Sequence, residues 1–187
     1  MKLTLAVFVC VFLMMPPAFA RTKKIPAAPE APGGKPGIVA SSVSLHVVTA
    51  SNGAAASGST TSAGAARATT THSAGIQIGI MNLGLSAETV AVRWFWVGRY
   101  EKSRNWFRAG DGEKAVTLDP KKSENLFAAS GDIENHVTKS KTSQYKSGGH
   151  MTGWVVTASN AKGELIAVRA SDSYLEGFAS QPPPKQR

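Results

Sequence analysis

The segment AVRWFWVGRY, residues 91–100, is the part of the chain that most strongly indicates its fold. Together with the preceding valine it has large apolar side chains at every second position: Val90, Val92, Trp94 and Trp96. A period of two is typical of a β-strand, because successive side chains point to opposite faces of a sheet. Since Phe95 makes the second face apolar as well, we predict a central strand that is covered on both sides.

Further strand-like runs lie on both sides of this segment. They are found at residues 43–47, 76–80, 105–108, 114–118, 125–129, 150–158 and 164–170. Sequences typical of turns separate several of them: Gly-Asp-Gly at 110–112, Asp-Pro at 119–120 and Ser-Asn-Ala-Lys-Gly at 159–163. The last of these is flanked by WVVTA and ELIAV, which is the pattern of a β-hairpin.

These runs predict an all-β fold. Seven or eight short strands indicate an antiparallel, immunoglobulin-like β-sandwich of about seven strands, and a small antiparallel β-barrel is the alternative. Trp94 or Trp96 would be the core tryptophan, although no cysteine pair flanks it. A short C-terminal helix is expected from the spacing of three apolar side chains behind a capping residue, Ser171 or Asp172: Tyr174, Leu175 and Phe178.

Composition excludes several other classes of protein. The chain has 187 residues, of which 42% are hydrophobic and 18% charged, and it contains one cysteine. Hydrophobicity is too high for a wholly disordered protein, and cysteine is too scarce for a disulfide scaffold. No apolar run is long enough for a bundle of membrane spans. One globular domain with some additional chain remains.

Residues 1–20 are interpreted as a signal peptide. Lys2 precedes a mostly apolar run at 3–15, and Ala18-Phe19-Ala20 provides the small residues of a cleavage site. We predict cleavage after Ala20 and export to the periplasm or beyond, with no transmembrane helix left after cleavage. Cleavage also removes Cys10, the only cysteine, and with it any disulfide or thiolate ligand.

Three segments have the composition of disordered chain. Residues 21–37 contain four prolines and are expected to form an extended tether. Residues 51–74 consist almost entirely of Ala, Ser, Thr and Gly, so we predict a disordered insertion within a domain that spans 38–180. Whether 38–49 belongs to the sandwich or to the tether stays open. Residues 181–187 are predicted to be a disordered tail.

The strongest indication of a binding site is positive charge. The net charge is +9, and residues 93–122 contain eight basic and four acidic side chains with aromatic residues between them. Such a strip can bind an anionic polymer, with cations on its phosphate or sulfate groups and rings on its sugars. The candidate residues are Arg93, Arg99, Lys102, Arg104, Trp106 and Arg108. The competing interpretation places the rings in the core and the cations on an ordinary solvated surface.

No pattern indicates catalysis or a cofactor. The string GDGEKA at 110–115 matches G-x-G-x-x-A, but no helix follows it, so we interpret it as a hairpin turn. In a strand, Asp132, Glu134 and His136 would share one face and could bind a cation, but we favour a solvated loop or an edge strand whose charges prevent further pairing. We therefore predict no enzyme activity, no cofactor and no metal site.

A resemblance supports this interpretation. The segments AVRWFWVGRY, GDGEKAVTLDP and GWVVTASNAKGELIAVRASDSYLEGFA resemble a group of small exported β-sandwich proteins of unknown function, common in some bacteria with complex envelopes. The resemblance covers about residues 75–180. It implies the fold and export, and it assigns no site.

Two functions follow as hypotheses. The first is a non-catalytic module of the cell envelope or secreted space that is structural or binds another protein. The second is binding of an anionic glycan or a membrane surface through the basic strip at 93–122. Export makes intracellular nucleic acid an improbable partner in both.

Overall fold

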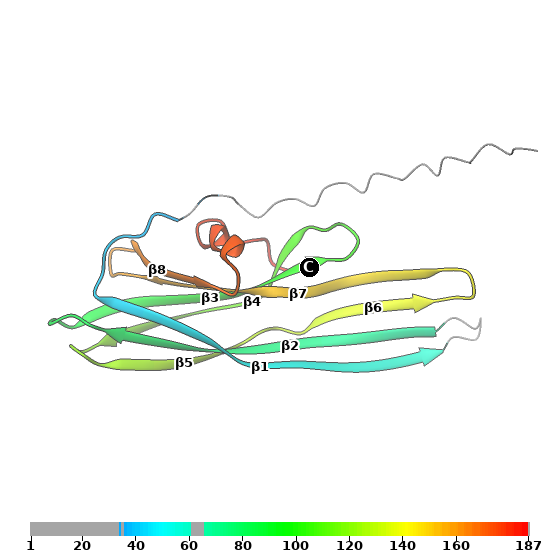
Figure 1. Cartoon of the computed structure of the whole chain (residues 1–187), viewed down its shortest axis with the longest axis horizontal. Helices are drawn as coiled ribbons and strands as arrows, with labels where there is room; N and C mark the ends of the chain where they lie inside the picture. Colours follow the sequence, from blue (N-terminus) through cyan, green and yellow to red (C-terminus); the bar gives the residue numbers. More distant parts are fainter. Residues whose placement is uncertain (1–33, 35, 61–65, 187) are drawn as a thin grey trace, which may run out of the picture.

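The computed structural model describes residues 34, 36–60 and 66–186, which form an antiparallel β-structure with one short helix (Figure 1). The predicted signal peptide, and the predicted tether apart from residues 34, 36 and 37, lie outside the described residues. The elements are β1 (Val43–Thr60), β2 (Ala66–Asn82), β3 (Glu88–Tyr100), β4 (Trp106–Leu118), β5 (Ser123–Ala129), β6 (Ile133–Lys139), β7 (Gln144–Ser159), β8 (Leu165–Ala170) and the 3₁₀ helix η1 (Ser173–Ala179). No helix in this described part is long and apolar enough to cross a membrane.

The strands lie in two layers (Figure 1). One layer contains β1, β2 and β5, and the other contains β4, β3, β7 and β8. Strand β6 pairs with both β2 and the beginning of β7, and so joins the layers at one end. Because Ile76, Ile78 and Ile80 of β2 belong to the same buried cluster as Val92 and Trp96 of β3, the main core lies between the layers.

The central position predicted for residues 90–100 is confirmed. Strand β3 pairs with β4 on one edge and β7 on the other. Trp96 is buried between the layers, whereas Phe95 and Val97 point to the opposite face. There they pack with Leu175 and Phe178 of η1 in a second cluster. The strand is therefore covered on both faces, as its two apolar sides predicted.

The turn predicted at 110–112 is wrong, because these residues lie inside β4. One continuous strand replaces the two separate runs that the sequence indicated, and Gly112 lies opposite Trp94 in the register. A Cβ atom at Gly112 would come within 2.8 Å of Trp94 Nε1. Glycine is thus required here by the close approach of an indole ring, and not by a turn.

The structure also differs from the sequence prediction over residues 51–74. The described parts, 51–60 and 66–74, are paired antiparallel along the extensions of β1 and β2, and β6 pairs with the other edge of β2 from Ala66 to His72. Backbone hydrogen bonds on both edges of β2 and the β-branched threonines favour a strand although little apolar surface is available. Residues 43–49 likewise belong to the sheet, with Val43 and Leu45 buried.

This pairing leads to a prediction. Replacing residues 51–74 with a short Gly/Ser link removes one of the two partner strands of β6, so we expect a loss of about 2 kcal/mol, which lowers the melting temperature of a domain of this size by roughly 4 to 8 °C. Thermal unfolding followed by circular dichroism measures the change. An unchanged melting temperature would mean that the extended hairpin contributes no stability and that the composition-based prediction of disorder describes it better.

The structure confirms the predicted hairpin turn at 159–163 but differs from the prediction for the C-terminal tail. The hairpin at 159–163 is confirmed: Asn160 N donates to Glu164 O at 2.9 Å, and Gly163 has a φ of +79°. Residues 181–187 were expected to be disordered, but residues 184–186 lie beside β4, where Arg108 N donates to Pro184 O at 2.7 Å and Gln186 N donates to Arg108 O at 3.0 Å. The edge of β4 offers unpaired backbone groups that the tail satisfies, and Pro183 is buried there. Residue 187 lies outside the described residues.

The C-terminal helix is present as a 3₁₀ helix. Asp172 occupies its N-cap without a side-chain hydrogen bond to the helix. Ser171 has a different role, because its Oγ accepts a hydrogen bond from Trp154 N at 3.2 Å. Leu175 and Phe178 are buried, so the helix is held by apolar packing on β3 and β7 and not by a capping side chain.

Candidate functional site

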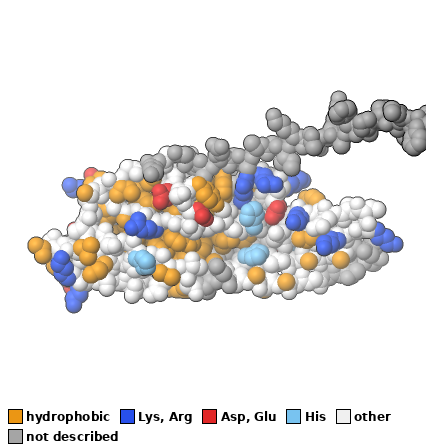
Figure 2. Space-filling view, viewed as in Figure 1, with side chains coloured by type: hydrophobic (Ala, Val, Ile, Leu, Met, Phe, Trp, Pro, Cys, Tyr) orange, Lys and Arg blue, Asp and Glu red, His pale blue; other side chains and the backbone are white. Residues whose placement is uncertain are grey.

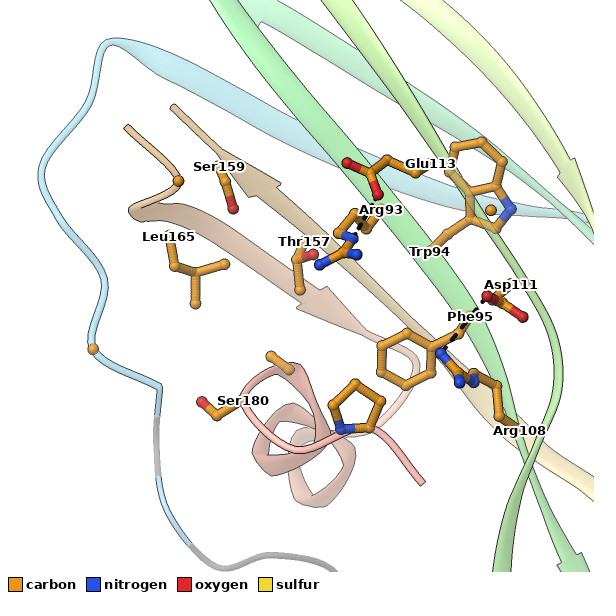
Figure 3. A pocket seen from close by; sticks show the side chains of 15 residues that line it. Arg93, Trp94, Phe95, Arg108, Asp111, Glu113, Thr157, Ser159, Leu165 and Ser180 are labelled. Carbon is orange, nitrogen blue, oxygen red and sulfur yellow. Dashed lines mark ion pairs between the residues drawn. The ribbon is translucent and has the colours of Figure 1, made fainter. Parts of the chain in front are cut away.

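A groove lies on the outer face of the layer that contains β3, β4, β7 and β8, where η1 and the C-terminal tail cross it. Its volume is about 450 Å³. Two of the six predicted binding residues, Arg93 of β3 and Arg108 of β4, line it (Figure 3). The ring of Phe95 and the hydroxyl groups of Thr157, Ser159 and Ser180 also line it.

Carboxylates neutralise both arginines in this groove (Figure 3). Arg93 Nε lies 2.8 Å from Glu113 Oε2, and Arg108 Nη1 lies 3.6 Å from Asp111 Oδ2. Lys185 Nζ of the tail also approaches Asp111, at 3.3 Å from Oδ1. Because the charges are paired within the sheet, the groove does not present the concentrated positive potential that a polyanion requires. It offers hydrogen-bonding groups that match an uncharged polar ligand.

The other four predicted residues gather around the loop between β3 and β4, in a region where Figure 2 shows Lys and Arg side chains close together. The guanidinium carbon of Arg99 lies 5.1 Å from the centre of the Trp106 ring, and Arg99 Nε donates to Arg104 O at 3.0 Å. Lys102 and Arg104 are exposed. Within the described residues, none of the three cations forms an ion pair with a carboxylate.

The aromatic side chains beside this loop are mostly structural. Trp106 packs edge-on against Phe178, with ring centres 5.5 Å apart, and Phe107 is fully buried. Tyr174 lies 6.3 Å from Trp106, measured between ring centres. Burial, and then the charge of Asp172, raise the pKa of the Tyr174 phenol above its usual value, while Arg99 opposes the shift.

The predicted strip at 93–122 is therefore divided between two places. Arg93 and Arg108 line the groove as paired charges, whereas Arg99, Lys102 and Arg104 surround the loop together with Trp106. Sequence spacing cannot reveal this division, because it depends on which carboxylates the register of β3 and β4 places beside each arginine.

The acidic and histidine residues at 132–136 form a pair and no larger cluster. Glu134 Oε2 lies 3.4 Å from His136 Nε2, and His136 Nδ1 shares a hydrogen bond of 3.0 Å with Thr69 Oγ1. Asp132 precedes β6 and does not join them in the strand. In the described part of the chain, no three His, Cys, Asp or Glu side chains lie close enough to hold a metal ion.

The sequence analysis missed a surface that the fold brings together. On the outer face of β1, β2 and β5, Val48 lies opposite Gln77, and Gln77 lies opposite Phe127. Phe127 is 65% exposed, Val48 49% and Met81 41%. The positions of this surface, which we call the uncharged face, are Ser44, His46, Val48, Gln77, Gly79, Met81, Ser123, Asn125, Phe127 and Ala129.

None of the ten positions is Lys, Arg, Asp or Glu, in a chain with a net charge of +9. In the sequence, these positions are the alternate residues of three strand-like runs, on the side opposite to the buried apolar residues. Only the register shows that the three strands are neighbours, so that these side chains form one surface.

Comparisons with known proteins do not assign a family. No family model matches the chain, and no curated protein matches it. Among solved structures, a structural-genomics target named SoR45 shares 12% identity at a TM-score of 0.31, covering 71% of this chain and 87% of that one. A putative ApaA protein from Bordetella pertussis shares 12% identity at a TM-score of 0.27, covering 71% and 95%.

A putative β-galactosidase from Bacteroides fragilis shares 13% identity at a TM-score of 0.29, and the alignment covers 63% of this chain and 15% of that one. Similarity at this level identifies neither the fold family nor a function. The functional argument therefore rests on the surfaces of the chain itself.

Proposed function

We propose that the protein is an exported, non-catalytic, immunoglobulin-like β-sandwich module that binds a partner protein through the uncharged face. The observation on which this rests is the exposure of Phe127, Val48 and Met81 on a sheet surface without a formal charge. Export is supported by the signal-like residues 1–20, and the sandwich by the two layers around one core.

The chemistry of the face indicates the chemistry of its partner. Burying the exposed part of Phe127, 65% of its surface, would stabilise a complex by about 1 to 2 kcal/mol. Since the face has no formal charge, a docked partner desolvates no ion on this side, and its own docking surface should be apolar and uncharged. Clusters of exposed apolar side chains on a soluble protein mark such interaction sites.

Position-specific photocrosslinking in the cells that produce the protein tests this function. With a benzophenone side chain at Phe127 or at Val48, we expect one adduct of the same mass from both positions. Thr117, which is exposed on β4, is the matched control and should give none. Denaturing electrophoresis followed by mass spectrometry measures the adducts.

A second substitution makes this test specific for the face. Gln77→Glu places a charge between Val48 and Phe127 and should lower the yield of adduct at least about tenfold, since a buried unpaired carboxylate is costly. Thr117→Glu should leave the yield unchanged. Equal yields from Thr117, no adduct at any position, or an adduct of two copies of the chain would each contradict the proposed heterologous partner.

A second candidate function is binding of an anionic glycan or membrane surface at the loop between β3 and β4. It is supported by Arg99, Lys102 and Arg104, whose charges have no carboxylate partner within the described residues. Arg93 and Arg108 do not strengthen it, because their charges are paired.

Retention on a heparin column tests this second function. Replacing Arg99, Lys102 and Arg104 together with Gln should lower the salt concentration at elution well below that of a control with the same change of charge. The control replaces Lys122, Lys139 and Lys162, which are exposed and scattered over the molecule. Equal losses in both triple variants would show that net charge alone determines retention.

A further inference from the structure

A second cavity lies where β7 changes partners. Strand β7 pairs with β6 up to Gly148 and with β8 only from Val155 onward. Residues 149–154 lie between these two partners, and within this segment Trp154 O accepts a hydrogen bond from Ser171 N at 3.1 Å. A cavity of about 320 Å³ is found beside residues 151–154, between β7 and the hairpin of β1 and β2. It is distinct from the uncharged face, which is on the other side of β2.

Two residues that line this cavity have side-chain polar atoms without a hydrogen-bond partner among the described residues. Trp96 lines the cavity and is only 2% exposed, yet its Nε1 has no acceptor among the described residues. Thr152, the residue that the bulge of β7 leaves without a partner in β3, also lines the cavity with a buried and unpaired Oγ1. An indole N–H can only donate, so it requires an acceptor from another molecule. Buried polar groups without any partner are rare in native proteins.

The remaining lining defines the rest of the ligand. Trp154, Met151 and Ala74 contribute apolar surface, and no Lys, Arg, Asp or Glu lines the cavity. Polar side chains also line it: Thr49, His72, Ser73 and Ser171. Its volume falls within the range of small-molecule sites. We propose that this cavity binds an uncharged, mostly apolar small molecule whose acceptor oxygen takes the hydrogen bonds of Trp96 Nε1 and Thr152 Oγ1.

Two probes of nearly equal shape test the proposal on the full chain. 2-Acetylnaphthalene has a carbonyl acceptor, whereas 2-isopropylnaphthalene replaces that oxygen with a methyl group. We expect the ketone to shift the indole N–H resonance of Trp96 and to bind about five- to tenfold more tightly than the hydrocarbon, the effect of one neutral hydrogen bond. Two-dimensional ¹H–¹⁵N NMR measures both dissociation constants and reports that each variant is folded.

Three variants separate this site from non-specific binding. Trp96→Phe removes the donor and keeps an aromatic ring, and Thr152→Val removes the hydroxyl at nearly constant volume. Each should weaken ketone binding and reduce its advantage over the hydrocarbon, while Trp106→Phe, outside the cavity, should change neither. Equal binding of the two probes, no binding of the ketone, or an unaltered preference in the folded Thr152→Val variant would overturn the proposal.

Discussion

Replacing Trp96 with alanine is expected to lower the free energy of unfolding by about 3 to 5 kcal/mol. Trp96 is 2% exposed and belongs to the core between the two layers, opposite Trp154 of β7 in the register. Truncation removes apolar contacts with both layers and leaves a cavity that strands fixed by pairing on both edges of β3 cannot fill. Denaturant unfolding followed by circular dichroism measures the loss.

Two neighbours on the same strand serve as controls. Trp94 is only partly buried and packs against the backbone of Gly112, so Trp94→Ala should cost less than Trp96→Ala. Arg93→Ala should cost less than about 1 kcal/mol, because its side chain is 66% exposed and its ion pair with Glu113 lies on the surface. If Arg93→Ala were the most damaging of the three, the register of β3 would be inverted.

The sequence predicted those features of the fold that depend on neighbouring residues. The alternation at 90–96 and 76–80 identified buried strands, because a strand with one buried face has an apolar side chain at every second residue. The hairpin at 159–163 was predictable for the same reason, since Asn160 and Gly163 make its turn by local hydrogen bonds and a positive φ.

The features that were mispredicted depend on partners distant in the sequence. Residues 51–60 and 66–74 look disordered by composition, and only pairing with β6 shows why the second of these segments is a strand. The Gly-Asp-Gly at 110–112 resembles a turn until Trp94 is placed across from Gly112. Glycine has two opposite uses, a turn or a space for a ring, and local sequence does not distinguish them.

The candidate sites were predictable to different degrees. The basic strip was visible in composition, but its pairing with Glu113 and Asp111 was not. The uncharged face requires three strands to be placed side by side, and the cavity requires the hairpin of β1 and β2 to lie against β7. Surfaces that combine distant strands therefore lie beyond what a single sequence indicates.

A final prediction concerns Phe107, whose ring lies across two glycines. Phe107 is fully buried, and Cβ atoms built at Gly98 of β3 and at Gly149 of β7 would both overlap its ring, the latter at 2.7 Å. Phe107→Ala is expected to cost about 3 to 5 kcal/mol. Gly98→Ala should cost about 1 to 3 kcal/mol, because the added methyl group displaces the ring.

The two substitutions should not be additive, and this distinguishes ring contact from a general intolerance of alanine at Gly98. In the Phe107→Ala background the ring atoms that the added methyl group would overlap are gone, so Gly98→Ala should then cost less than about 0.5 kcal/mol. Gly58→Ala on β1 is the matched control, since its Cβ would meet nothing closer than Arg67 O at 3.8 Å, and it should be neutral or slightly stabilising. Denaturant unfolding of the four chains of the cycle gives the coupling energy. A coupling energy near zero would mean that the Phe107 ring does not pack on the backbone of β3 at Gly98. Contact with an aromatic ring would then not explain why glycine occupies this position of the strand.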